Sequence, residues 1–169
     1  MAVIFRAMTE EDYDAVYALW LTIDGFGIRS LDDSREGIVR FLRRNPGLSV
    51  VAVEEASENA GKDDNNPGAE RSGGEIVGAI LCGEDGRRGC LYHVCVRRDH
   101  RRRGTGTGMV AYCMKALREA GINKVSLIAF TRNDVGNAFW KTIGWTKRED
   151  LHYYDFVLNE ENITRFIGE

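Results

Sequence analysis

Hydrophobic residues recur at two different spacings along this chain, one typical of strands and the other typical of helices. Runs in which apolar residues alternate with polar ones, or follow one another without a break, predict strands. Turn-forming residues such as Gly, Asn, Asp and Pro separate several of these runs and mark where the chain reverses. The expected strands cover residues 2–9, 48–55, 75–83, 89–96, 124–130, 145–149 and 151–158.

Other segments have the helical period. Thr9 precedes an acidic run, which is a favourable helix start, and Tyr13, Val16 and Trp20 then recur at helical spacing. A second helix is expected to begin near residues 32–34 and to end at Asn45. Further helices are expected after the glycines at 104–108, ending at Gly121, and between Asn133 and Gly144.

The order of these elements indicates one domain of the α/β (α+β) class that covers residues 1–169. Few crossovers connect the strands, so we expect a mixed, largely antiparallel central sheet with helices on both faces. Residues 56–74 contain no Val, Ile, Leu, Met or aromatic residue and cannot anchor themselves in a core. They are predicted to form a mobile insertion at the tip of a hairpin.

Composition narrows the possible functions. The 169 residues carry a net charge of −3, so a basic run at residues 97–103 stands out on an acidic chain, and nucleic acid is not an expected partner. An apolar stretch of membrane-spanning length and a secretion signal are both lacking, which predicts a cytoplasmic protein without membrane contact. Cysteine and histidine spacings match no zinc site, so we expect no metal.

The segment HVCVRRDHRRRGTGTGM, residues 93–109, joins a strand to a helix through arginines and alternating glycines. Such a junction directs backbone amides and the positive end of a helix dipole toward one anion. A Walker A loop is excluded because no Lys-Ser or Lys-Thr follows the glycines, and the dinucleotide-binding fingerprint fits poorly. The pattern therefore indicates a site for one phosphorylated small molecule.

Arg101-x-x-Gly104-x-Gly106 resembles the acetyl-CoA pyrophosphate motif of the GNAT family of N-acetyltransferases, and Arg103-x-x-Gly106-x-Gly108 offers a second register. The later stretch NDVGNAFWKTIGW is similar to a second signature of that family. The stretch GRRGCLYHVCVRRDHRRRG also resembles the ribosomal-protein-alanine acetyltransferase branch. The resemblance implies the GNAT fold over roughly residues 3–158 and acetyl-CoA as the acyl donor.

By this resemblance, strand amides at residues 93–96 hold the pantetheine and the thioester carbonyl, amides at 102–107 hold the pyrophosphate, and nearby arginines steer it. The implied cofactor-binding residues are Val94, Cys95, Val96, Arg101, Arg102, Arg103, Gly104, Thr105, Gly106, Thr107, Gly108, Asn133, Phe139 and Trp140. Trp140 stands where the family usually has a Tyr that protonates the departing CoA, so the general acid is open. No carboxylate occupies the strand positions at which the family sometimes places a base.

Strand alternation puts Cys90, Tyr92 and Val94 on one face, which the family pattern directs toward the cleft. Tyr92 is therefore the first candidate for proton transfer and His93 the second. Glu84 or Asp85 comes third. Tyr154, with Tyr153, is expected either to shape the acceptor pocket or to replace the missing general acid, and we count Tyr154 among the catalytic candidates. A half-buried packing role for Tyr92 and a core role for His93 are the structural alternatives.

The sequence predicts acetyl transfer to a primary amine, by direct attack in a ternary complex. The acceptor is open among a protein N-terminus, a lysine and a small molecule, and a homodimer is also open because dimers occur among relatives. The alternative from another class is a non-catalytic acyl-CoA-binding sensor or partner module on the same fold. Binding of acetyl-CoA without turnover would favour that alternative.

Overall fold

The computed structural model describes residues 2–55 and 74–168 of the chain. Its centre is a five-stranded sheet of order β1-β3-β4-β5-β6, antiparallel except for the parallel pair of β5 and β6. The mixed, largely antiparallel sheet expected from the sequence is thereby confirmed. The insertion predicted at 56–74 lies, except for Gly74, outside the described residues. The strands are β1 (Val3–Ala7), β3 (Val50–Glu54), β4 (Glu75–Glu84), β5 (Gly89–Val96) and β6 (Val125–Leu127).

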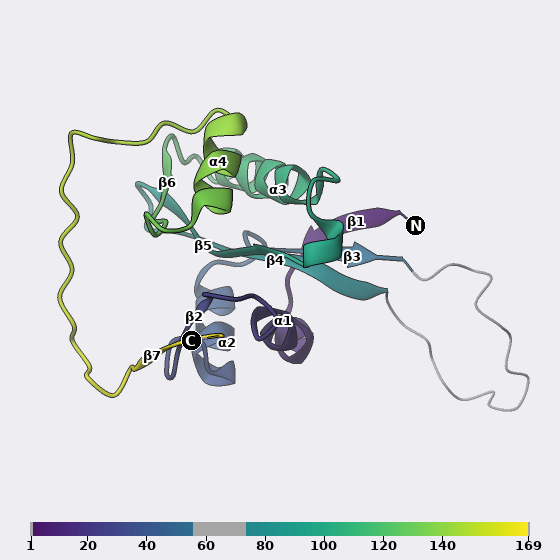
Figure 1. Ribbon diagram of the computed structural model, residues 1–169, viewed down its shortest axis with the longest axis horizontal. Coiled ribbons are helices and arrows are strands. Elements are labelled where there is room, and N and C mark those ends of the chain that lie inside the picture. Colours follow the sequence, from purple (N-terminus) through teal and green to yellow (C-terminus); the bar gives the residue numbers. More distant parts are fainter. Residues whose placement is uncertain (1, 56–73, 169) are drawn as a thin grey trace, which may run out of the picture.

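Helices cover both faces of the sheet, as Figure 1 shows. One face carries the first two helices and the other face the last two, and short 3-10 turns precede the first and the third. The helices are α1 (Tyr13–Trp20), α2 (Arg35–Arg44), α3 (Thr105–Glu119) and α4 (Asp134–Thr142), and the turns are η1 (Glu10–Asp12) and η2 (Arg98–His100).

Alternation along β3 explains why there are two apolar cores. Val51 and Val53 face the core that contains Trp20 of α1, whereas Val50 faces the core that contains Met109 of α3. All five of these residues are almost completely buried. The sheet thus has an apolar core on each of its two faces, and each face can carry a different binding function.

The helix starts follow the capping signals in the sequence. Ser34 accepts a hydrogen bond from the amide of Gly37 (3.1 Å) at the start of α2, and Asn133 accepts one from Gly136 (3.0 Å) at the start of α4. Before α1, the carboxylate of Asp12 accepts from the amide of Thr9 (2.8 Å). These local contacts need no tertiary information, which is why the helix starts could be predicted.

The C-terminal strands predicted at 145–149 and 151–158 are wrong. Neither segment forms a strand, and β6 ends at Leu127 instead of continuing to residue 130. The alternating pattern of residues 151–158 suits a strand, but a strand also needs a partner, and no described strand of this chain lies beside it. The segment runs outside the domain as a long extended connection (Figure 1).

A second, two-stranded sheet joins parts of the chain that are distant in sequence. β2 (Gly27–Arg29) pairs antiparallel with β7 (Thr164–Phe166). Gly27, in the segment between α1 and α2, is paired with Phe166 in this sheet. Asn162 strengthens the junction, because its side-chain oxygen accepts from the amides of Leu31 (3.1 Å) and Asp32 (3.2 Å).

Candidate active site

The site begins where the parallel strands β5 and β6 separate. Their pairing covers Gly89–Leu91 on β5 and Val125–Leu127 on β6 and then stops. Tyr92 and the residues that follow it on β5 therefore have a free edge toward the side from which β6 has diverged. Free strand amides at this edge can bind an extended polar ligand such as a pantetheine arm, which is the opening that the family resemblance implied.

A bulge in β5 determines which side chains face which layer. His93 has a φ of 50°, the left-handed region that a residue with a side chain seldom adopts. Along the β4 pairing, Leu81 lies opposite Tyr92 whereas Ala79 lies opposite Cys95, so β5 contains one extra residue there. Strict alternation, predicted from the sequence, is therefore wrong at this point.

The bulge brings Tyr92 and His93 to the same face of the sheet. Both line a cavity of about 520 Å³ on the side of α1 and α2. Val94, predicted to face the same way as Tyr92, instead packs with the core beneath α3. β5 thus directs Tyr92 and His93 to the cavity on one face of the sheet and Val94 to the core on the other face.

His93 forms a close pair with a buried carboxylate. Its Nε2 lies 2.7 Å from Oδ1 of Asp33, whose side chain is only 5% exposed. The other oxygen of Asp33 accepts a hydrogen bond from the amide of Arg29 (2.7 Å), which fixes the carboxylate. Rings of Trp20 and Phe26 lie 4.8 Å from the imidazole ring and hold it in place.

This pairing assigns the nitrogens of His93 to different tasks. With Asp33 as acceptor, Nε2 carries the proton and Nδ1 keeps a free lone pair. Nδ1 has no hydrogen-bond partner among the described residues. A histidine oriented in this way can take a proton from an amine, so it is a stronger candidate for the general base than Tyr92.

Tyr92 has a different chemical character. Burial, with a smaller contribution from Cys90, raises the pKa of its hydroxyl to about 12. Its ring packs edge-on against Phe41 of α2 at 5.9 Å. At neutral pH this residue is a neutral hydrogen-bond donor that shapes the cavity wall, and it is a poor base.

The loop before α3 has the backbone expected of an anion site. Arg102 and Gly104 both have left-handed φ values, 60° and 83°, which curve the chain so that successive amides converge. In the described part of the chain, the amides of residues 102–107 have no acceptor, and the first closed helical bond runs from Gly108 to Gly104 at 2.9 Å. Open amides at a helix N-terminus fit a pyrophosphate.

The arginines of this region do not share one role. Arg97 forms ion pairs with Asp99, whose carboxylate lies 2.8 Å from its Nε, and with Glu75 and Glu54. The Nε of Arg101 donates to the carbonyl oxygen of Val96 (3.0 Å), which ties the loop to the end of β5. The side chains of Arg102 and Arg103 are exposed beside the open amides.

The remaining predicted cofactor residues are placed as follows. A Cβ on Gly106 would lie 3.2 Å from the ring of Phe139, so α4 packs against the start of α3. The ring of Trp140 lies 5.0 Å from that of Phe139, and Asn133 caps α4. Gly108 has a packing role, because a Cβ there would lie 2.3 Å from Phe5. Thr105 is buried, whereas Thr107 is exposed.

Other sequence candidates lie outside the cavity. Tyr154, predicted to border the acceptor, is 86% exposed on the connection after α4. Asp85 accepts from the amides of Arg87 (2.8 Å) and Arg88 (2.7 Å), so it stabilises the turn between β4 and β5. Glu84 contacts the amide of Gly86 in the same turn.

Three residues of the site were not connected with His93 by the sequence. From the sequence, Asp33, with Asp24 and Asp32, is either a helix-cap or loop residue or a carboxylate that attracts a cationic amine, and nothing local connects it with a histidine 60 positions away. Arg40 and Arg44 line the cavity from α2, but in sequence they belong to an ordinary charged helix. Spacing of four residues does place them on one helix face, which is the only signal that they act together.

Comparison with known proteins gives consistent results. Residues 31–145 match the sequence profile described as the Acetyltransferase (GNAT) family. An acetyltransferase of Pectobacterium atrosepticum is 30% identical over 129 residues, which cover 76% of this chain and 77% of that protein. Among the described residues, no helix is long and apolar enough to cross a membrane.

Solved structures show the same fold. The PaiA N-acetyltransferase of Thermoplasma acidophilum in complex with coenzyme A is similar with a TM-score of 0.66, at 12% identity and 97% coverage of each chain. An aminoglycoside acetyltransferase from an uncultured soil metagenomic sample is similar with a TM-score of 0.62 at 18% identity, covering 93% of this chain and 97% of that one.

Proposed function

Because the chain belongs to the GNAT family of acetyltransferases, we propose that it moves an acetyl group from acetyl-CoA to a primary amine by direct attack, with both substrates bound at once. The family and the named relative establish an acetyltransferase of the GNAT family. The identity of the acyl group, the acceptor and the route of transfer belong to the proposal. The observation that carries it is the His93–Asp33 pair at the point where β5 and β6 separate.

The donor is held on the α3 side of β5. Open amides of residues 102–107 support binding of the pyrophosphate, and the exposed arginines at 102 and 103 supply charge for a further phosphate. Free amides of β5 beyond Leu91 support binding of the pantetheine arm and polarisation of the thioester carbonyl. We assign the rings of Phe139 and Trp140 to the far wall of the space that holds the pantetheine arm.

The amine enters from the α1 and α2 side. Its nitrogen lone pair attacks the thioester carbon, the N–C bond forms, the C–S bond breaks, and the sulfur leaves with the electron pair. Nδ1 of His93 takes the proton from the nitrogen, and Asp33 stabilises the resulting imidazolium. A thiol with a pKa of about 8.5 can leave as thiolate, so a dedicated acid in place of Trp140 is not required.

Direct attack agrees with the state of the cysteines. Burial raises the pKa of the Cys95 thiol to about 12, and a hydrogen bond with Cys82 together with burial raises the pKa of Cys113. These thiols remain protonated and enclosed, so they are poor nucleophiles for an acetyl-enzyme intermediate. Cys90 is only partly buried and is the cysteine to test.

Initial-rate kinetics test this proposal. Rates measured over a grid of acetyl-CoA and amine concentrations should give intersecting double-reciprocal lines, and Cys90→Ala should retain full activity. Parallel lines, or an acetyl group found on the protein by mass spectrometry after incubation with acetyl-CoA alone, would contradict direct attack. Binding of acetyl-CoA without any turnover of amines would instead favour a non-catalytic binding module.

A further inference from the structure

The arginines of α2 divide into a paired set and an unpaired set. Arg35 forms an ion pair with Asp14, and Arg43 forms one with Glu10 through its Nε at 2.7 Å. Both pairs connect α2 with the region of α1. Arg40 and Arg44 form no ion pair or hydrogen bond with any residue that the structure describes, although they belong to the same helix.

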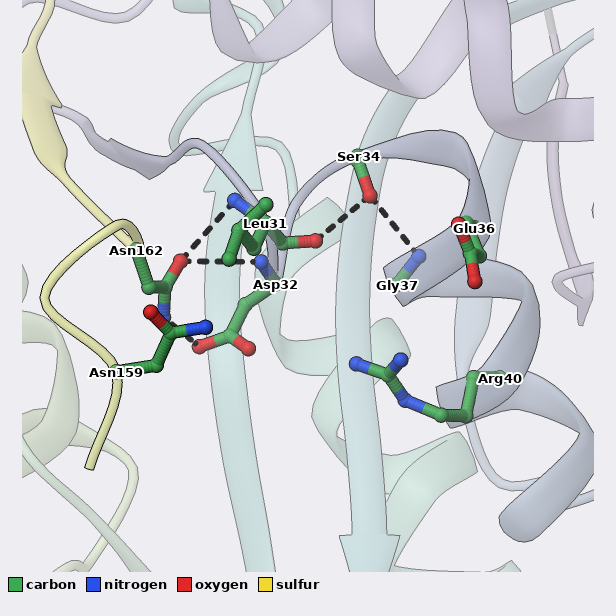
Figure 2. Close-up of a pocket in the computed structure, with 8 residues that line it drawn as sticks. All are labelled: Leu31, Asp32, Ser34, Glu36, Gly37, Arg40, Asn159 and Asn162. Atoms are coloured by element: carbon green, nitrogen blue, oxygen red, sulfur yellow. Dashed lines mark hydrogen bonds between the residues drawn. The ribbon is translucent and has the colours of Figure 1, made fainter.

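The unpaired arginines line the acceptor cavity together with the catalytic pair. Arg40 and Arg44 share this cavity with Tyr92, His93 and Phe41. Their spacing of four residues puts them on one helix face. Arg40 also reaches a neighbouring hollow of about 300 Å³, where Figure 2 shows it extending from α2 into the space bordered by Asp32 and Asn159.

The carboxylates that face the same space already have partners. Asp33 holds His93 and the amide of Arg29. Asp32 accepts a hydrogen bond from Nδ2 of Asn162 (2.7 Å) and lies 3.9 Å from the guanidinium of Arg29. Glu36, which borders the smaller hollow, forms no ion pair with Arg40 within the described chain. Arg40 and Arg44 thus add positive charge that no carboxylate in residues 2–55 or 74–168 pairs with.

We propose that the acceptor is an amine that also carries an anionic group, held by Arg40 and Arg44 while its nitrogen faces His93. The inference rests on the proposed function and names the substrate class of the same site. Carboxylate is the anion that we assign, from a free acidic amino acid or from the first residues of an acidic peptide. Arginine suits this task because its fork of donors binds carboxylate at two points.

An α-amine fits this site better than a lysine. At pH 7 an amine with a pKa of about 8 is deprotonated at a small cost, whereas a lysine amine with a pKa of about 10.4 is deprotonated far less readily. Two unmatched arginines also repel an acceptor with several positive charges. The cavity therefore disfavours a polycationic acceptor such as an aminoglycoside.

Acetylation of matched peptides tests this inference. The C-terminally amidated tripeptides Ala-Glu-Glu, Ala-Gln-Gln and Ala-Lys-Lys, which lack a terminal carboxylate, are compared with free L-glutamate by thiol release. Each compound is also titrated calorimetrically into the CoA-bound protein. The acidic compounds should have KM or Kd values at least 10-fold lower than the neutral and basic peptides. Preference for the acidic tripeptide over glutamate would identify a peptide end as the acceptor, and the reverse would identify a free amino acid.

Charge-removing variants complete the test. Arg40→Gln and Arg44→Gln should each raise the KM or Kd for the acidic compound about 10-fold or more and leave the KM for acetyl-CoA unchanged, whereas Arg43→Gln should change neither. Equal use of the three peptides, or variants that keep the acidic preference, would overturn this inference alone. Failure of the protein to bind acetyl-CoA would overturn the proposed function itself.

Discussion

The most informative substitution in this protein is Asp33→Asn. Asparagine has the shape of aspartate, but it offers one acceptor oxygen where Asp33 uses two. Asp33 accepts from Nε2 of His93 and from the amide of Arg29, both at 2.7 Å. If the Asn oxygen accepts from Arg29, its NH₂ group faces His93 and requires the tautomer in which Nε2 is the acceptor. The proton then sits on Nδ1, where the base is needed.

The expected loss of activity follows from this exchange of nitrogens. General base catalysis contributes about 100-fold to 10,000-fold, so kcat should fall within that range, equivalent to about 2.7–5.5 kcal/mol of barrier. Loss of a charge-assisted hydrogen bond should also lower the free energy of unfolding by about 1.5–3 kcal/mol. Thiol release gives kcat, and thermal unfolding followed by circular dichroism establishes that the variant is folded.

Asp32→Asn is the matched control for this experiment. Asp32 is the neighbouring carboxylate, its side chain is 52% exposed, and its hydrogen bond goes to Asn162 and not to His93. The control should keep kcat within about threefold of the wild type. A folded Asp33→Asn variant with kcat reduced by threefold or less would refute the reasoning, because His93 would then act without a fixed tautomer.

Three further predictions concern the donor site and the stability of the fold. Gly108→Ala should lower the free energy of unfolding by about 1–3 kcal/mol, because its Cβ would lie 2.3 Å from Phe5. Gly106→Ala has its nearest contact at 3.2 Å, so it should change the free energy of unfolding by less than about 1 kcal/mol while it weakens acetyl-CoA binding. Equal unfolding midpoints of the two variants in chemical denaturation would contradict this contrast. The double substitution Arg102→Gln with Arg103→Gln should raise the calorimetric Kd for CoA at least 10-fold and hardly alter that for 3′-dephospho-CoA; equal losses would place the 3′-phosphate elsewhere. The ring N–H groups of His100 donate to the carboxylates of Asp99 and Glu54, which raises its pKa above the ordinary 6.5. The protonated form is therefore favoured in the folded state, and its contribution to stability is complete below pH 6.5 and lost as pH rises through the folded pKa. Thermal unfolding of wild type and His100→Asn should therefore differ more at pH 6 than at pH 9, and a constant difference would contradict this assignment.

Local signals predicted most of the scaffold. Caps at Ser34 and Asn133 and the glycine-rich junction before α3 are encoded within a few residues, so their elements and the open amides at 102–107 could be anticipated. The resemblance to the GNAT family rested on the same local stretches. Sequence was sufficient wherever the physical cause of a structure lies within one turn of chain.

Tertiary causes account for what the sequence did not predict. At the bulge, His93 has a φ of 50°. The sequence does not indicate this conformation, because the position holds neither of the residues that usually adopt it, glycine or asparagine. Asp33 reaches His93 only because the turn before α2 lies against β5, and β2 becomes a strand only because β7 returns to it. The apolar pattern of residues 151–158 correctly indicates an extended segment, but its pairing depends on a partner that the pattern does not identify.

Binding of acetyl-CoA at the loop before α3 is measured by calorimetric titration of acetyl-CoA into the purified protein, with 3′-dephospho-CoA titrated alongside. The open amides of residues 102–107 and the exposed arginines beside them predict saturable one-to-one binding, weakened about 10-fold or more when the 3′-phosphate is removed. Absence of binding would contradict the account, because the loop would then hold no donor and the His93–Asp33 pair would have no acetyl group to direct toward an amine.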